Sequence, residues 1–307
     1  MQIYLPIAEL PVSILTILAM GAAVGFLSGM FGIGGGFLMT PLLIFLGIPP
    51  AVAVGTQATQ IVASSVTGAL AHLARNSIDF KMGGVLLGGG ILGSLSGIYL
   101  FKMLSNIGQI DLAISVVYVL FLSVIGAMMM IESMQAIRAA RGGATPRRRS
   151  GHHSWIHGLP LKMRFRRSKL YISVIPPVLI GYFVGTLSAI MGVGGGFILI
   201  PAMIYILRMP TNVVIGTSFF QIVFVAALTG VMHAVENQAV DIVLAFLLVI
   251  GGVVGAQYGV RVAERMPAEQ LRALLAALLL LIGLRLGYEL VSPPEDPYSI
   301  TEVQVVK

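Results

Sequence analysis

Two glycine clusters are the residues of this chain best suited to binding chemistry. Gly-Ile-Gly-Gly-Gly-Phe occupies 32–37, Gly-Val-Gly-Gly-Gly-Phe occupies 192–197, and a proline follows each, Pro41 and Pro201. Glycine can leave backbone N–H groups unpaired, and a helix that begins after such a break points its N-terminal N–H groups at it. This geometry suits a small anion, so the candidate site includes Gly34, Gly35, Gly36, Gly194, Gly195 and Gly196.

Close helix packing is the alternative role for these glycines, because small residues are common where membrane helices touch. The duplication of the cluster favours binding, since paired interruptions at matching places in two halves mark transporter sites. A nucleotide phosphate loop is disfavoured because no lysine follows either cluster.

Polar side chains at helical spacing follow each cluster and form a second candidate feature. The first copy carries Thr56, Gln57, Gln60, Ser64 and Thr67, and the second carries Thr217, Ser218, Gln221 and Thr229. Such a stripe can line a solvated path, although hydroxyls and amides in membrane helices also bond to their own backbone or to neighbouring helices. We assign substrate binding to Thr56, Gln57, Gln60, Thr217, Ser218 and Gln221; the glutamines offer both donors and acceptors.

Three ionisable residues are candidates for a proton or gating role. His72 and His233 lie near the ends of equivalent segments, and histidine can change its protonation near neutral pH. Arg285 interrupts an apolar run and could attract an anion, or it could reach outward and pair with Glu289 one turn on. The histidines could equally be interfacial residues beside Asn76 and Asn237. Neither catalytic nor metal-binding residues are predicted.

The elements that must position these residues are apolar segments long enough for membrane helices. They lie at about 12–31, 34–47, 51–74, 82–101 and 110–138, and again at about 171–191, 194–207, 211–235, 240–262 and 268–291. Most have the roughly 20 residues that cross a bilayer as helix, but the second of each half has only about 14 and is expected to start inside the membrane. The predicted fold is an all-α integral membrane protein with two homologous five-segment repeats, each with a glycine-broken helix pair.

Four regions follow from this division. The first repeat covers 1–140, a basic loop 141–169, the second repeat 170–292 and a polar C-terminal tail 293–307. Because clusters of Lys and Arg stay cytoplasmic, the loop is placed inside. Five crossings per half then invert the second repeat relative to the first and leave both termini outside, although Lys102 falls outside too. If the short segments re-enter without crossing, the repeats would instead be parallel.

Composition excludes several other classes. Hydrophobic residues make up 57% of the 307 residues and charged ones 10%, too few to cover a soluble domain. The net charge of +7 is concentrated in the basic loop, which membrane topology explains better than nucleic-acid binding does. The chain has no cysteine, which excludes disulfides and thiolate metal sites. The first apolar stretch is expected to be a spanning segment rather than a cleaved signal peptide.

The duplicated glycine motif with its proline, a Gly-Thr pair after Pro49 and Pro210, and a matching glutamine resemble the TauE/SafE sulfite exporter family, also called the TSUP family. The resemblance implies a carrier in the bacterial inner membrane that needs no cofactor and exports a small anion such as sulfite or sulfoacetate. Its partners would be that anion, the lipid bilayer and, in a homodimer, a second copy. An anion channel, a carrier of a small carboxylate and a membrane enzyme remain alternatives.

Overall fold

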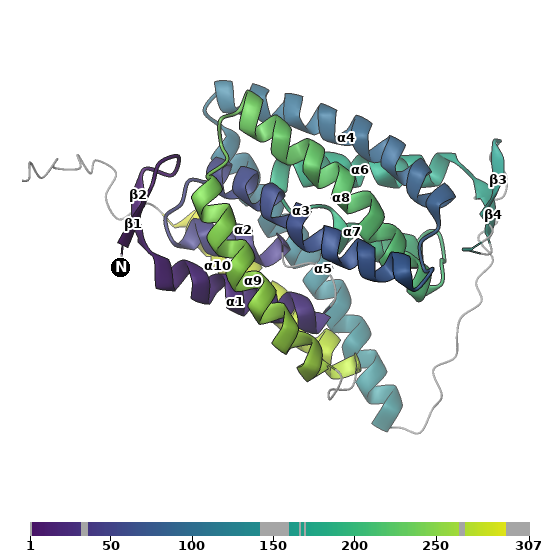
Figure 1. Cartoon of the computed structure of the whole chain (residues 1–307). Coiled ribbons are helices and arrows are strands. Elements are labelled where there is room, and N and C mark those ends of the chain that lie inside the picture. Colours follow the sequence, from purple (N-terminus) through teal and green to yellow (C-terminus); the bar gives the residue numbers. More distant parts are fainter. Residues whose placement is uncertain are drawn as a thin grey trace, which may run out of the picture.

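The computed structural model describes residues 2–31, 36–141, 160–165, 167–168, 170–263 and 268–292. In this part of the chain the backbone forms ten helices, five in each half (Figure 1). The first half contains α1 (Ile14–Phe31), α2 (Gly36–Phe45), α3 (Pro50–Ala74), α4 (Phe80–Asn106) and α5 (Ile110–Arg141). The second contains α6 (Ile175–Met191), α7 (Gly196–Tyr205), α8 (Thr211–Glu236), α9 (Ile242–Ala263) and α10 (Ala268–Val291).

Each predicted apolar segment corresponds to one of these helices, so the all-α membrane class is confirmed. Five helices, α4, α5, α8, α9 and α10, are long and apolar enough to cross a membrane. The predicted short segments are ten-residue helices, α2 and α7, about 15 Å long and therefore about half of a crossing. α3 has 25 residues, but its hydroxyls and glutamines make it less apolar than those five.

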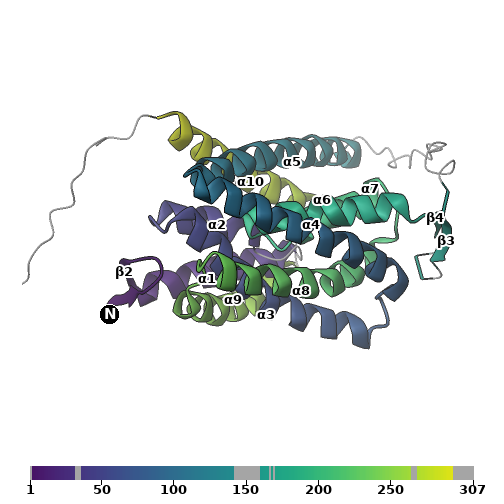
Figure 2. The same ribbon diagram turned by 90° about the horizontal axis from the view of Figure 1, so that it is seen from above.

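Two short antiparallel hairpins were not predicted. β1 (Gln2–Leu5) pairs with β2 (Leu10–Ser13) directly before α1, and β3 (Lys162–Phe165) pairs with β4 (Leu170–Ser173) directly before α6. The second hairpin falls mostly within the stretch that we expected to be only a basic loop. Both views place the two hairpins at opposite ends of the helix bundle (Figures 1 and 2).

The two halves are interlocked, because the first helix of each half packs on the fourth helix of the other. α1 lies against α9, and α6 lies against α4. The third helices, α3 and α8, pack on each other, as do the fifth helices, α5 and α10. The contacts are therefore reciprocal, as in an arrangement with an approximate two-fold axis.

Glycines allow these helices to touch backbone to backbone. A Cβ atom at Gly93 of α4 would lie 2.0 Å from the carbonyl oxygen of Tyr182 in α6, and one at Gly255 of α9 would lie 1.9 Å from that of Ala22 in α1. Such distances are impossible for real atoms, so any side chain would push the helices apart. Gly93 and Gly97 of α4 lie at the contact with α6, and the matching Gly255 and Gly259 of α9 lie at the contact with α1.

A pair of buried aspartates fastens the halves a second time. The backbone N–H of Asp241 donates to Thr56 Oγ1 at 3.0 Å, and that of Asp79 donates to Thr217 Oγ1 at 3.1 Å. Each aspartate also caps the helix that follows it, accepting from Leu244 N or from Met82 N. We call these two arrangements the aspartate clasps.

Each clasp also holds a hairpin turn. Asp79 Oδ2 accepts from the backbone N–H and the hydroxyl of Ser168, between β3 and β4, at 3.0 and 2.7 Å. Asp241 Oδ2 accepts from the backbone N–H of Ile7, between β1 and β2, at 3.2 Å. Helix starts and hairpins at both ends of the bundle are thus tied to the opposite half.

The glycine contacts can be tested with two substitutions on α4. Gly93→Ala should lower the thermal unfolding temperature in detergent, because overpacking at such a site costs about 1–3 kcal/mol. Gly88→Ala is the matched control: a Cβ there meets no atom within 4 Å, and alanine favours helix by about 1 kcal/mol. Equal stability of the two variants would contradict the close packing of α4 on α6.

Candidate functional site

The second glycine cluster interrupts the helical backbone between α6 and α7. Gly192 ends α6 with φ 68°, and Gly194 and Gly195 follow with φ 71° and 76°. This left-handed region is unfavourable for other residues, which explains why glycine is required here. The carbonyl of Met191, left free by the break, accepts from Tyr118 Oη at 2.6 Å and from Thr40 Oγ1 at 3.4 Å.

The starts of the two half-helices lie together at the centre of the interlocked halves. The rings of Phe37 and Phe197, the second residues of α2 and α7, stack with centroids 4.5 Å apart. A Cβ atom at Gly36 would lie 2.8 Å from the carbonyl oxygen of Val193. Gly34 and Gly35 lie outside the described residues. The first residues of both short helices, whose N–H groups have no partner within their own helix, therefore lie next to each other.

The predicted glutamines differ in how their amides are satisfied. Gln57 Nε2 donates to Gln60 Oε1 at 2.8 Å, which pairs these two side chains of α3 but leaves Gln57 Oε1 buried without a partner in the described structure. Gln221 of α8 is fully buried, and neither its Nε2 nor its Oε1 has a hydrogen-bond partner in the described structure. Burying an unpaired polar group costs about 1–3 kcal/mol, so Gln221 is poised to bond a ligand or water.

Two serines that the sequence analysis missed are also buried without a hydrogen-bond partner among the described residues. They are Ser94 of α4 and Ser188 of α6. A Cβ atom at Gly90 would lie 2.7 Å from Gln221 Nε2, and one at Gly185 would lie 2.2 Å from the carbonyl oxygen of Gly90.

Ser94 is one turn beyond Gly90 on α4, and Ser188 is one turn beyond Gly185 on α6. Ser188 also lies beside the start of α7, its Cβ 3.8 Å from where a Cβ of Gly195 would stand. We call Gln221, Ser94 and Ser188 the unpaired polar cluster. Ser188 has a counterpart in the first half, Ser28, and each stands four residues before its glycine cluster. This repetition is the sequence signal that could have identified Ser188.

Thr56, Thr217 and Ser218 are buried and make hydrogen bonds within the protein. The two threonine hydroxyls accept from the aspartate clasps, and Ser218 Oγ contacts Met203 Sδ at 3.5 Å. Asp79 and Asp241 were not predicted, although they recur at matching places, each directly before the fourth helix of its half. Among the predicted substrate-binding side chains, Gln221 and the Oε1 of Gln57 are buried without a hydrogen-bond partner in the described structure.

The two histidines have different surroundings. His233 is buried: its Nε2 donates to the carbonyl of Ala189 at 2.9 Å, and its Nδ1 accepts from Asn237 Nδ2 at 2.9 Å. Both ring nitrogens are thus used in the neutral form. His72 Nδ1 lies 2.9 Å from Ser77 Oγ, and its ring stacks on Phe219.

Arg285 is exposed and lies over Phe45, the last residue of α2. Its side chain is 61% exposed, its Nε lies 3.5 Å from Glu289 Oε1, and its guanidinium lies 4.5 Å from the centroid of the Phe45 ring. These contacts match the alternative in which the arginine reaches outward and pairs with Glu289.

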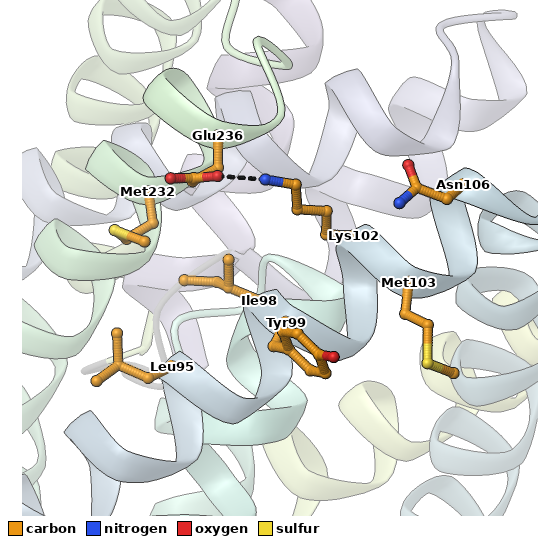
Figure 3. A pocket seen from close by; sticks show the side chains of 8 residues that line it. All are labelled: Leu95, Ile98, Tyr99, Lys102, Met103, Asn106, Met232 and Glu236. Carbon is orange, nitrogen blue, oxygen red and sulfur yellow. Dashed lines mark hydrogen bonds and ion pairs between the residues drawn. The ribbon is translucent and has the colours of Figure 1, made fainter.

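A groove of about 380 Å³ lies elsewhere, between the C-terminal ends of α4 and α8 (Figure 3). Apolar side chains such as Leu95 and Met232 line it, and Lys102 Nζ and Glu236 Oε2 form an ion pair across it at 2.6 Å. No predicted site residue lines this groove. The pair offsets the positive charge of Lys102. Because both side chains are partly exposed, it contributes little to the stability of the folded protein.

Comparison with known proteins agrees with this architecture. The family model described as "Sulfite exporter TauE/SafE" matches residues 17–286. A "Probable membrane transporter protein YunE" of Bacillus subtilis is 26% identical over 286 residues, covering 90% of this chain and 98% of that protein. A "Probable membrane transporter protein" of Xylella fastidiosa is 28% identical over 262 residues, covering 84% and 88%.

A shorter match is to "Sulfite exporter TauE/SafE family protein 5" of Arabidopsis thaliana, 42% identical over 55 residues, which cover 18% of this chain and 12% of that protein. No solved structure matches the chain. Since the family model spans nearly all ten helices, the chain belongs to the sulfite exporter TauE/SafE family of membrane transporters.

Proposed function

We propose that this membrane transporter exports a small anion, sulfite or an organosulfonate, by alternating access between its two halves. The observation that carries the proposal is the unpaired, fully buried amide of Gln221 in a bundle where two half-helix starts lie together. N-terminal N–H groups and helix dipoles favour an anion, and an amide and two hydroxyls can complete its hydrogen bonding. The family name supports sulfite as the first substrate to test.

Alternating access would use an inverted repeat. The reciprocal packing of α1 on α9 and of α6 on α4 supports a two-fold relation between the halves. The equivalent hairpins at opposite ends of the bundle support inversion rather than a parallel arrangement (Figure 1). Rocking one half against the other would then expose the site first to one face of the membrane and then to the other.

The basic loop would place the end of the bundle that carries β3 and β4 in the cytoplasm of a bacterial cell. Lys102 lies at the opposite end of α4 from Asp79, so this orientation places it outside, against the positive-inside rule. Its ion pair with Glu236 offsets that charge. An anion leaving a cell with a negative interior is driven by about 2.3 kcal/mol per charge per 100 mV, so export would need no ATP.

The inverted orientation predicts a labelling pattern, and the absence of cysteine makes the native chain a ready background. Tyr4→Cys on β1 and Tyr171→Cys on β4 replace two exposed tyrosines. An impermeant maleimide should label the first in intact cells and the second only after permeabilisation. Labelling of both from one side would contradict the inversion.

The two central glutamines should not be equally important. Gln221→Leu removes an amide that has no protein partner, so transport should fall at least about tenfold, about 1.4 kcal/mol, with little loss of stability. Gln60→Leu is the matched control on the other half; it leaves Gln57 unpaired and should lower stability more. Near-normal transport by purified Gln221→Leu protein would remove this residue from the site.

Efflux from proteoliposomes tests the function itself. Labelled sulfite, isethionate and a small carboxylate should be compared while membrane potential and pH gradient are set independently. We expect saturable efflux of the sulfur anions that is accelerated by the same anion on the other side. Flux without exchange stimulation would favour an anion channel, and preference for the carboxylate would favour a carboxylate carrier.

A further inference from the structure

The groove between the C-terminal ends of α4 and α8 lies apart from the unpaired polar cluster and has a composition of its own. Four of its lining residues, Leu95, Tyr99, Lys102 and Asn106, recur every three or four positions along α4 and therefore share one face of that helix (Figure 3). This stripe is apolar at Leu95 and polar at Lys102 and Asn106. At a rise of about 1.5 Å per residue it is about 16 Å long.

The depth of the groove in the membrane follows from the two helices that form it. Both α4 and α8 are long and apolar enough to cross a membrane. Apolar side chains near their C-terminal ends are exposed, with Tyr99 74% and Val235 68% exposed. Since α4 ends at Asn106 and α8 at Glu236, the polar end of the stripe stands where both helices end. Lipid headgroups lie at this level, and acyl chains lie beside the apolar part of the stripe.

The ion pair across the groove keeps unused hydrogen-bonding capacity of both signs. Lys102 Nζ donates to Glu236 Oε2 at 2.6 Å. An ammonium has three donors and a carboxylate has two acceptor oxygens, so further N–H groups of Lys102 and the Oε1 of Glu236 have no partner among the described residues. The two side chains are 49% and 38% exposed, so a headgroup can reach both.

We propose that this groove binds a phospholipid whose headgroup carries a primary ammonium, as phosphatidylethanolamine does. Its phosphate accepts from Lys102, and its ammonium donates to Glu236. One acyl chain lies against the apolar side chains of Leu95, Ile98 and Met232. The headgroup and the ion pair each carry one charge of each sign, so the two associate without leaving a net charge. This lipid site is independent of the anion transport proposed above.

Other phospholipid headgroups match the ion pair less closely. A choline headgroup carries the same two charges, but its quaternary ammonium has no N–H group to donate to Glu236. A glycerol headgroup leaves the lipid with negative charge alone, which Lys102 attracts and Glu236 repels from nearly the same distance. The charge pattern of the groove therefore favours a primary ammonium over both.

Lipids with identical acyl chains test this preference. Native mass spectrometry of the delipidated protein in detergent should compare dioleoyl phosphatidylethanolamine with the dioleoyl forms of phosphatidylcholine and phosphatidylglycerol. The first should bind at least about threefold more tightly than either of the others, because it alone pairs by hydrogen bonds with both charges. Equal binding of the three lipids would contradict the proposal.

A change at Glu236 tests the role of the ion pair. Glu236→Gln removes the negative charge and keeps the size of the side chain, which leaves Lys102 as an unbalanced cation. The ratio of phosphatidylglycerol to phosphatidylethanolamine binding should then rise at least about threefold. Lys81→Met removes an exposed charge at the other end of α4 and should leave the ratio unchanged. Folded Glu236→Gln protein with the native ratio would overturn the proposal.

A second copy of the chain is the other occupant that this surface could accept. Because the native chain has no cysteine, Tyr99→Cys places a single thiol on the stripe, at an exposed position. With lipid in the groove, two such chains should stay largely unlinked when membranes are treated with a mild oxidant. Near-complete disulfide linkage would show that a second copy covers the groove, and the lipid site would be wrong.

Discussion

Backbone contact between the halves is the constraint on which the rest of this structure depends. In lipid there is little hydrophobic force between helices, so association relies on close packing and on hydrogen bonds. Gly93 and Gly255 supply the close packing where α4 crosses α6 and where α9 crosses α1. Because each crossing joins one half to the other, neither half contains its own complete set of helix neighbours.

The aspartate clasps solve a second problem of the membrane environment. A helix that begins inside a bundle leaves N–H groups that need partners, and an unpaired one is costly where water is scarce. Asp79 and Asp241 cap α4 and α9, while Thr217 and Thr56 accept the aspartates' own N–H groups. Since each bond joins opposite halves, the same residues that satisfy the backbone also fix how the halves meet.

The packing of the two halves is reciprocal, but the equivalent glutamines Gln60 and Gln221 differ in their hydrogen bonding. Gln60 has Gln57 as a partner, whereas the equivalent Gln221 has none. A fully satisfied scaffold would have little reason to bind a small polar molecule, because every donor would have to break a bond first. Gln221 differs from Gln60 in this way, and with Ser94 and Ser188 it places unpaired polar atoms beside α4, α6 and α8; Gln57 Oε1 on α3 and Thr229 Oγ1 on α8 are buried and unpaired as well.

The sequence by itself determined the membrane class, the approximate positions of the described helices and the glycine break before α7, because hydropathy, helix length and glycine's backbone freedom are local properties. It did not reveal the hairpins or the clasps, or that Thr56 and Thr217 accept bonds from aspartate N–H groups of the other half. Only the tertiary structure decided these, since the clasp bonds join residues 185 and 138 positions apart in the chain. Whether a buried hydroxyl or amide is free for a ligand depends on which distant backbone group reaches it, and packing alone sets that.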